Sequence, residues 1–127
     1  MPGRRGRWAA VLAFVVVVLG ACDDPVPREG LVRATLVSPN GLEGAALFEV
    51  PVEGVLSVKA RVGLVLESRA AGTRQLAVVL SKPDTIALEL LVADAQRPPT
   101  LRLLQVSGPD DRMRALTGYQ IRIEVPK

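Results

Sequence analysis

Carboxylates are the groups in this 127-residue sequence that could most directly do chemistry. Asp110 and Asp111 stand together in a Gly-Pro-Asp-Asp-Arg run, and Asp84 and Asp94 occur earlier. Such acids could hold Ca²⁺, which takes about six to eight oxygen ligands. They could also form the acid–base pair of a hydrolase, whose carboxyl groups lie about 5–10 Å apart. A turn in which Asp110 bonds the local backbone explains the same pair without either activity. Because the spaced Asp-x-Asp-x-Asp-Gly pattern does not occur, we predict the turn and no metal site.

Several catalytic arrangements are excluded by residue types that the sequence lacks. There is no histidine, which removes the Ser-His-Asp and Cys-His arrangements of nucleophilic catalysis. The one cysteine is Cys22, so the rest of the chain offers no thiol as a nucleophile or as a zinc or copper ligand. No glycine pattern matches a phosphate-binding loop. We therefore expect neither enzymatic activity nor a cofactor, and a carboxylate-based hydrolase remains the alternative.

The first 22 residues differ sharply from the rest of the chain. Residues 1–7 contain three arginines and no acid, residues 8–21 contain no charge, and Cys22 and Asp23 follow directly. This order is typical of a signal peptide with a basic end, an apolar stretch and a cleavage site. The apolar stretch is shorter than the roughly 20 residues that a permanent membrane span needs. The sequence therefore predicts export across a membrane.

The residues before the cysteine add a more specific signal. Leu19-Gly20-Ala21-Cys22 resembles the bacterial lipobox, in which an aliphatic and two small residues precede an acylated cysteine. The resemblance implies cleavage before Cys22, attachment to the membrane through acyl chains on Cys22, and a location in the bacterial cell envelope, facing the periplasm or the exterior. The alternatives are an ordinary secretory signal with a chance cysteine and an uncleaved anchor. Asp23 resembles the signal that retains enteric lipoproteins in the inner membrane; otherwise it is the acidic start of a tether, so the choice of membrane stays open.

Charge gives no indication of nucleic-acid binding. Arg4, Arg5 and Arg7 account for the whole excess of 16 Lys and Arg over 13 Asp and Glu. The remainder of the chain is neutral in sum and its charges are scattered, which leaves no basic surface for a phosphate backbone. We expect no nucleic-acid partner.

Beyond the signal, the chain divides into a tether and a domain. We assign 1–21 to a signal peptide that forms a helix, 22–30 to the acylated cysteine and a flexible tether rich in proline and glycine, and 31–127 to one domain. Apolar residues alternate with polar ones from Leu31 onward, and turn residues recur every 8–12 positions. This pattern predicts an all-β fold, a small antiparallel β-sandwich of about seven to nine strands. The expected strands outside one ambiguous segment are 31–37, 45–50, 55–62, 64–68, 74–81, 100–106 and 119–125.

Segment 85–96 permits two interpretations. Ile86, Leu88, Leu90 and Val92 alternate as in a strand, whereas the Ala, Leu and Glu content favours a helix with an N-cap at Asp84. We favour the strand, because the flanking segments are strands and a helix here would be apolar nearly all round. Proline in Lys82-Pro83-Asp84 predicts the end of the preceding strand.

Alternation also predicts which side chains point inward. In 55–62 the inward residues are Leu56, Val58, Ala60 and Val62, and in 100–106 they are Leu101, Leu103 and Gln105. Phe48 and Tyr119, the aromatic residues beyond the signal, are predicted to lie in the core.

Three apolar residues fall opposite these core faces. Leu91, Leu104 and Val106 form either a second buried layer or an exposed patch, and exposed apolar patches mark interaction sites. The partner expected at such a patch is an envelope protein or a surface polymer.

The segment order from Gly44 to Val125 resembles the cohesin and carbohydrate-binding-module group of β-sandwiches. The similar segments are 44–50, 54–58, 85–92 and 101–108 with the acidic turn at Asp110. The chain also resembles short lipoproteins rich in Arg and Val from GC-rich bacteria. The resemblance implies a non-catalytic binding or structural module, without transferring any binding residue. A polar-groove carbohydrate-binding module is a further alternative, since the predicted domain has no Trp for stacking on sugars.

Overall fold

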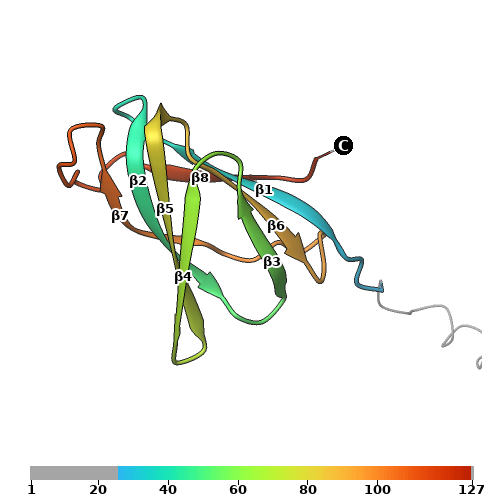
Figure 1. Ribbon diagram of the computed structural model, residues 1–127. Coiled ribbons are helices and arrows are strands. Elements are labelled where there is room, and N and C mark those ends of the chain that lie inside the picture. The colour runs from blue at the N-terminus through green and yellow to red at the C-terminus, as the bar shows by residue number, and fades with distance from the viewer. Residues whose placement is uncertain (1–25, 127) are drawn as a thin grey trace, which may run out of the picture.

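Alternating apolar and polar side chains form eight strands within residues 26–126, which are the residues described by this computed structural model (Figure 1). The strands are β1 (Gly30–Val37), β2 (Glu43–Pro51), β3 (Val55–Ala60), β4 (Leu64–Ala70), β5 (Thr73–Asp84), β6 (Ala87–Val92), β7 (Arg102–Ser107) and β8 (Gln120–Glu124). Among the described residues there is no helix, and so none long and apolar enough to cross a membrane. The predicted signal helix lies outside these residues.

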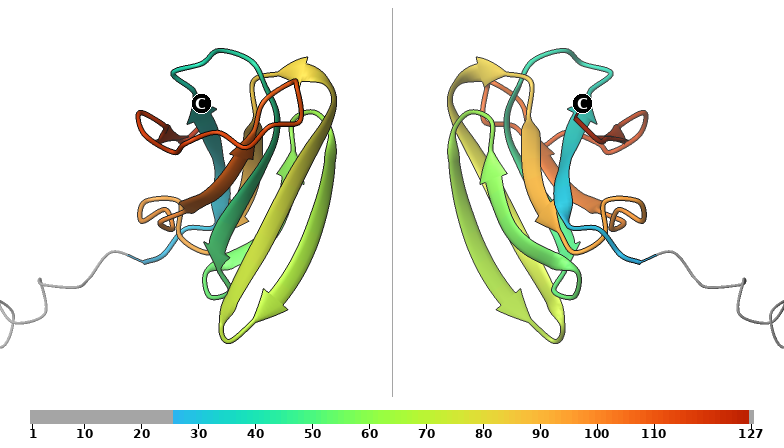
Figure 2. Two further views of the ribbon diagram at one scale, coloured as in Figure 1. Left: turned by 90° about the vertical axis from the view of Figure 1, so that its left-hand side faces the viewer. Right: turned by 90° about the vertical axis from the view of Figure 1, so that its right-hand side faces the viewer.

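The strands form two antiparallel sheets of four strands each. One sheet, here called the β1 sheet, has the order β3-β6-β1-β8, and the other, the β2 sheet, has the order β4-β5-β2-β7. The two sheets face one another as layers (Figures 1 and 2). The predicted all-β sandwich of about seven to nine antiparallel strands is confirmed.

The core between the layers is aliphatic apart from Phe48, and Tyr119, which was also predicted to lie in the core, is half-buried and packs against it. Phe48 of β2 is 2% exposed and lies among Val, Leu and Ile side chains from both sheets, as predicted. Burial of this apolar surface is the main stabilising contribution, at about 25 cal/mol for each Å² removed from water. The alternation predicted for Leu88, Leu90 and Val92 is found on β6. The inward residues of β1, β5 and β6 that are fully or almost fully buried are Val32, Ala34, Leu36, Leu76, Val78, Leu88, Leu90 and Val92.

The ambiguous segment contains a strand rather than a helix. Ala87–Val92 forms β6, which pairs with β1 on one side and with β3 on the other. Because β6 is flanked by strands on both sides, its backbone groups bond to the neighbouring strands. The predicted strand is confirmed, and tertiary pairing outweighs the helix propensity of the Ala and Leu residues.

A β-bulge in β3 changes the predicted inward face there. Val55 lies opposite Val92, but the next pair joins Ser57 to Leu91, so Leu56 is an extra residue. The extra residue turns Val55 into the core at 4% exposure and leaves Leu56 on the surface at 54%. The inward assignment of Leu56 was wrong for this reason. The inward assignment of Val62 was also wrong, because β3 ends at Ala60 and Val62 is exposed.

A second bulge, in β7, has the same effect. Phe48 pairs with Leu103 and Leu47 with Gln105, which makes Leu104 the extra residue. Beyond the bulge the faces are exchanged, so Gln105 is exposed and Val106 is fully buried. The predicted inward position of Gln105 is therefore wrong, whereas Leu101 and Leu103 do pack on the core.

Pro83 does not end its strand, contrary to the prediction. β5 continues through Pro83 to Asp84, and its ladder with β2 passes from Ala45–Val79 to Glu43–Asp84 through an irregular stretch. A proline is tolerated in such a stretch, because it cannot donate a ladder hydrogen bond and here none is required.

Candidate functional site

The chain that follows the predicted lipidation site joins the domain at β1. Cys22, the peptidase residues Leu19, Gly20 and Ala21, and the sorting residue Asp23 lie outside the described residues. Residues 26–29 are exposed and run into β1. The amide of Ala95 donates to the carbonyl of Arg28 at 2.8 Å, so the chain is attached to the domain from Arg28 onward.

The acidic pair forms the predicted turn. The amide of Asp111 donates to the carbonyl of Gly108 at 3.1 Å, and the amide of Arg112 donates to Oδ1 of Asp110 at 3.2 Å. Asp111 has φ of 60°, a left-handed conformation that aspartate tolerates in turns. Backbone bonding therefore explains the Asp110–Asp111 pair.

The other two candidate acids are engaged separately. Asp84 accepts from Arg61 at 3.2 Å and from its neighbouring amide, and Asp94 accepts from the amide of Gln96 at 3.1 Å. Residues 26–126 contain no group of three or more His, Cys, Asp or Glu side chains that could hold a metal ion. Three of the carboxylates singled out in the sequence therefore each bond a partner of their own.

A buried carboxylate that sequence reasoning missed lies at the beginning of β2. Glu43 is 2% exposed, and Arg114 Nε donates to its Oε1 at 2.7 Å. Its Oε2 accepts hydrogen bonds from Ser38 Oγ at 3.0 Å and from the Tyr119 hydroxyl. Asn40 Nδ2 donates to that hydroxyl at 3.0 Å. This Glu43 cluster satisfies the buried charge and ties two connecting segments to β2.

The Glu43 cluster adjoins a shallow hollow of about 490 Å³. Its lining residues are Pro39, Asn40, Asp110, Arg112, Met113, Arg114, Ala115 and Thr117. One carboxylate, that of Asp110, is among them, and the Arg114 guanidinium that reaches the hollow is already paired with Glu43. The lining therefore supplies one carboxylate, whereas a glycosidase-type reaction uses two.

The predicted interaction patch is not a single surface. Val106 is 0% exposed and belongs to the core, because the bulge at Leu104 turns it inward; its place in a surface patch is corrected accordingly. Leu91 is half-buried on β6 in the β1 sheet, and Leu104 is half-buried on β7 in the β2 sheet. The three residues therefore do not act together.

An apolar surface does exist, on the outward side of the β2 sheet. Register places Leu64, Val79 and Ala45 in one row across β4, β5 and β2, and Leu66, Ala77 and Leu47 in the next row. We call these six residues the apolar outer face. Leu64 is 60% exposed, Leu66 55% and Val79 44%, although all three lie within regular strands.

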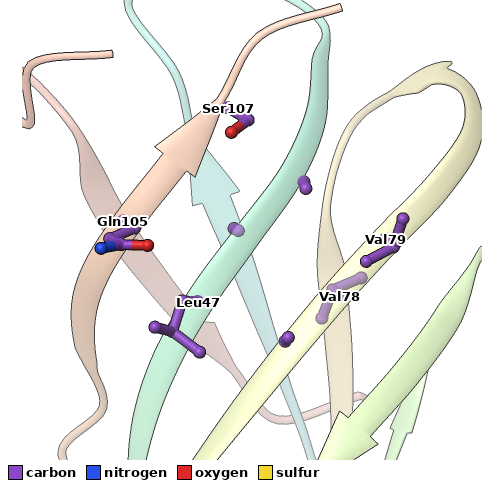
Figure 3. Close-up of a pocket in the computed structure, with 8 residues that line it drawn as sticks. Leu47, Val78, Val79, Gln105 and Ser107 are labelled. Carbon is purple, nitrogen blue, oxygen red and sulfur yellow. The ribbon is translucent and has the colours of Figure 1, made fainter. Parts of the chain in front are cut away.

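The apolar outer face is hollowed where its residues are small. The side chains of Ala45 and Ala77 leave two adjoining shallow depressions of about 180 and 160 Å³. Figure 3 shows the larger one, with Leu47 and Val79 beside it and the polar side chains of Gln105 and Ser107 at its border. A row of exposed aliphatic side chains with a polar border has the composition of a protein contact surface.

Comparison with known proteins gives no match. No protein-family model matches the chain, and no curated protein and no solved structure is significantly similar to it. An assignment of function therefore depends on the residues and geometry of this chain.

Proposed function

We propose that this protein is a lipid-anchored module of the bacterial cell envelope that binds a protein partner and catalyses no reaction. The observation that carries the proposal is the position of Cys22, the one cysteine in the chain, directly after an uncharged stretch and eight residues before β1 begins at Gly30. One acyl chain holds a protein to a bilayer only marginally, whereas two or three, each adding about 0.8 kcal/mol per buried CH₂, hold it stably. The short segment after Cys22 would keep the domain close to the membrane.

The non-catalytic part of the proposal is supported by the condition of the carboxylates. Glu43 is neutralised by Arg114, Asp84 pairs with Arg61, and Asp110 bonds a backbone amide. Each of these acids therefore has a partner within the fold that accounts for its position. Among the described residues no observation favours the hydrolase alternative.

The binding part of the proposal is supported by the apolar outer face. Its exposed Leu64, Leu66 and Val79 lie on ordered strands, where an aliphatic side chain gains nothing from water contact. Contact with another protein would remove this surface from water.

Metabolic labelling with an alkyne analogue of palmitate tests the anchor. The full chain is expected to incorporate the label and to remain in the membrane fraction, whereas Cys22→Ala is expected to lose the label. The matched control is Asp24→Ala, which changes a nearby residue outside the lipobox and is expected to be labelled normally. Retention of label by Cys22→Ala would refute lipid anchoring at this residue.

A further inference from the structure

We infer that this domain also pairs with a second copy of the same chain, through antiparallel pairing of the two β4 strands. The inference goes beyond the binding role proposed above, because pairing at this edge leaves the apolar outer face of each copy exposed. Pairing would extend the β2 sheet across a two-fold axis into one sheet of eight strands. The features that point to it are the open edge of β4, the direction of its free backbone groups and its charges.

β4 is the longest of the four edge strands among the described residues, and it is also regular. It has seven residues and pairs with β5 without a register shift, whereas β3 and β7 each have six and contain a bulge, and β8 has five. Natural sheets block unwanted strand addition with bulges, prolines, short edges or charged side chains. β4 has no bulge and no proline, and its two charged residues, Glu67 and Arg69, have opposite signs. An open, regular edge of this kind is suited to pairing with another strand.

The backbone groups that β4 offers can be identified from its neighbours. Val52 N donates to Gly72 O, just before β5 begins. In β5, therefore, the backbone amides and carbonyls of even-numbered residues point toward β2. The backbone groups of odd-numbered residues in β5 therefore point toward β4. Because Gln75 pairs with Ser68, it is the even-numbered residues of β4 whose backbone groups bond to β5. The amides and carbonyls of Val65, Glu67 and Arg69 consequently point toward the open edge.

Charge selects one register for the two-fold pair. If the two-fold axis passes through Ser68, Glu67 of each copy lies opposite Arg69 of the other. Both residues have backbone groups that point toward the open edge and can bond across it. An axis at Glu67 or at Arg69 would instead oppose like charges, which destabilises a cross-strand pair. The register centred on Ser68 forms two opposite-charge pairs and places Leu66 opposite Ala70 of the other copy.

This pairing is compatible with two copies anchored in one membrane. An axis between two antiparallel edge strands is perpendicular to the sheet, so both copies keep their β1 sheets on the same side. Residues 26–29 leave the domain on that side, away from β4 and β5 (Figure 2). Both tethers can therefore reach the same bilayer, and tethering raises the effective concentration of each copy for the other.

Disulfide crosslinking of the full chain in bacterial membranes tests the pairing. Ser68 and its counterpart form a non-hydrogen-bonded pair with Cα atoms about 4.5 Å apart, within the range that a disulfide spans. Ser68→Cys, oxidised with copper phenanthroline, is expected to give a reducible band at twice the mass of the chain. Ser57→Cys, at the bulged edge of β3, is the matched control and is expected to give at least tenfold less dimer. The unsubstituted chain reports any crosslink through Cys22.

Charge reversal tests the register in the same assay. Arg69→Glu converts both charge pairs to repulsions and is expected to lower the dimer yield about tenfold. Arg122→Glu is the matched control, because Arg122 on β8 also has a glutamate two positions away and is similarly exposed. It is expected to leave the yield unchanged. Arg69 also pairs with Glu67 of its own copy at 3.1 Å, so both substitutions reverse one exposed intrachain pair, and their difference reports the contact between copies.

Three results would overturn the pairing: no Ser68→Cys dimer, equal dimer from Ser57→Cys, or a crosslinked band of another mass. Palmitate labelling of the same samples separates this inference from the proposed anchor. A labelled chain that does not crosslink refutes the pairing alone, and an unlabelled chain that does crosslink refutes the anchor alone.

Discussion

Replacement of Arg114 by methionine probes the buried Glu43 cluster. The substitution keeps an apolar side chain of similar reach but removes the guanidinium that donates to Glu43 at 2.7 Å. Glu43 is 2% exposed, so its charge cannot be solvated in place. Breaking a buried ion pair costs about 3–5 kcal/mol. The side chain of Arg114 is itself 28% exposed, and solvent screening reduces the expected cost to about 2 kcal/mol.

Urea unfolding of residues 23–127 measures this cost, and a double-mutant cycle assigns it to the pair. In a Glu43→Gln background no buried charge remains, so Arg114→Met is expected to cost about 1 kcal/mol or less. Arg112→Met is the matched control, since the side chain of Arg112 is 86% exposed and its loss is expected to cost under about 0.5 kcal/mol. An equal cost of Arg114→Met in both backgrounds would refute the assigned role of the ion pair.

Two further predictions use the same unfolding assay. Phe48→Ala empties the centre of the core and is expected to cost about 3–5 kcal/mol, whereas Leu56→Ala, at the exposed bulge, is expected to cost under about 0.5 kcal/mol; similar costs would contradict the assignment of faces in β3. Gly63→Ala would bring a Cβ within 2.6 Å of the carbonyl oxygen of Val79 and is expected to cost at least about 1 kcal/mol more than Gly54→Ala. Both glycines have positive φ, and a Cβ at Gly54 meets nothing within 4 Å, so equal costs would exclude the clash as the cause.

Much of the fold follows from periodicity in the sequence. Alternation located the strands, and it placed Ile86, Leu88 and Leu90 correctly inward because β6 pairs without interruption along β1. The errors of face at Leu56, Gln105 and Val106 have one cause. A bulge adds a single residue and exchanges the faces beyond it, and nothing in the local composition marks where the bulge occurs.

The candidate surfaces depend on long-range register and could not be derived from local patterns. Glu43 is separated from Arg114 by 71 positions and from Tyr119 by 76, so the cluster has no sequence signature. The apolar outer face likewise combines residues of β2, β4 and β5 that are neighbours only through pairing. The predicted patch was wrong about Val106 because it assumed uninterrupted alternation.

Lipid anchoring at Cys22 is tested most directly by mass spectrometry of the protein purified from its own membranes. We expect a mature chain that begins at Cys22, with the mass of a diacylglyceryl group, or of that group and one further acyl chain, on its first residue. Digestion should leave the added mass on the peptide that contains Cys22 and Asp23. A chain that retains Met1, or one that begins elsewhere and carries no lipid on Cys22, would contradict the account.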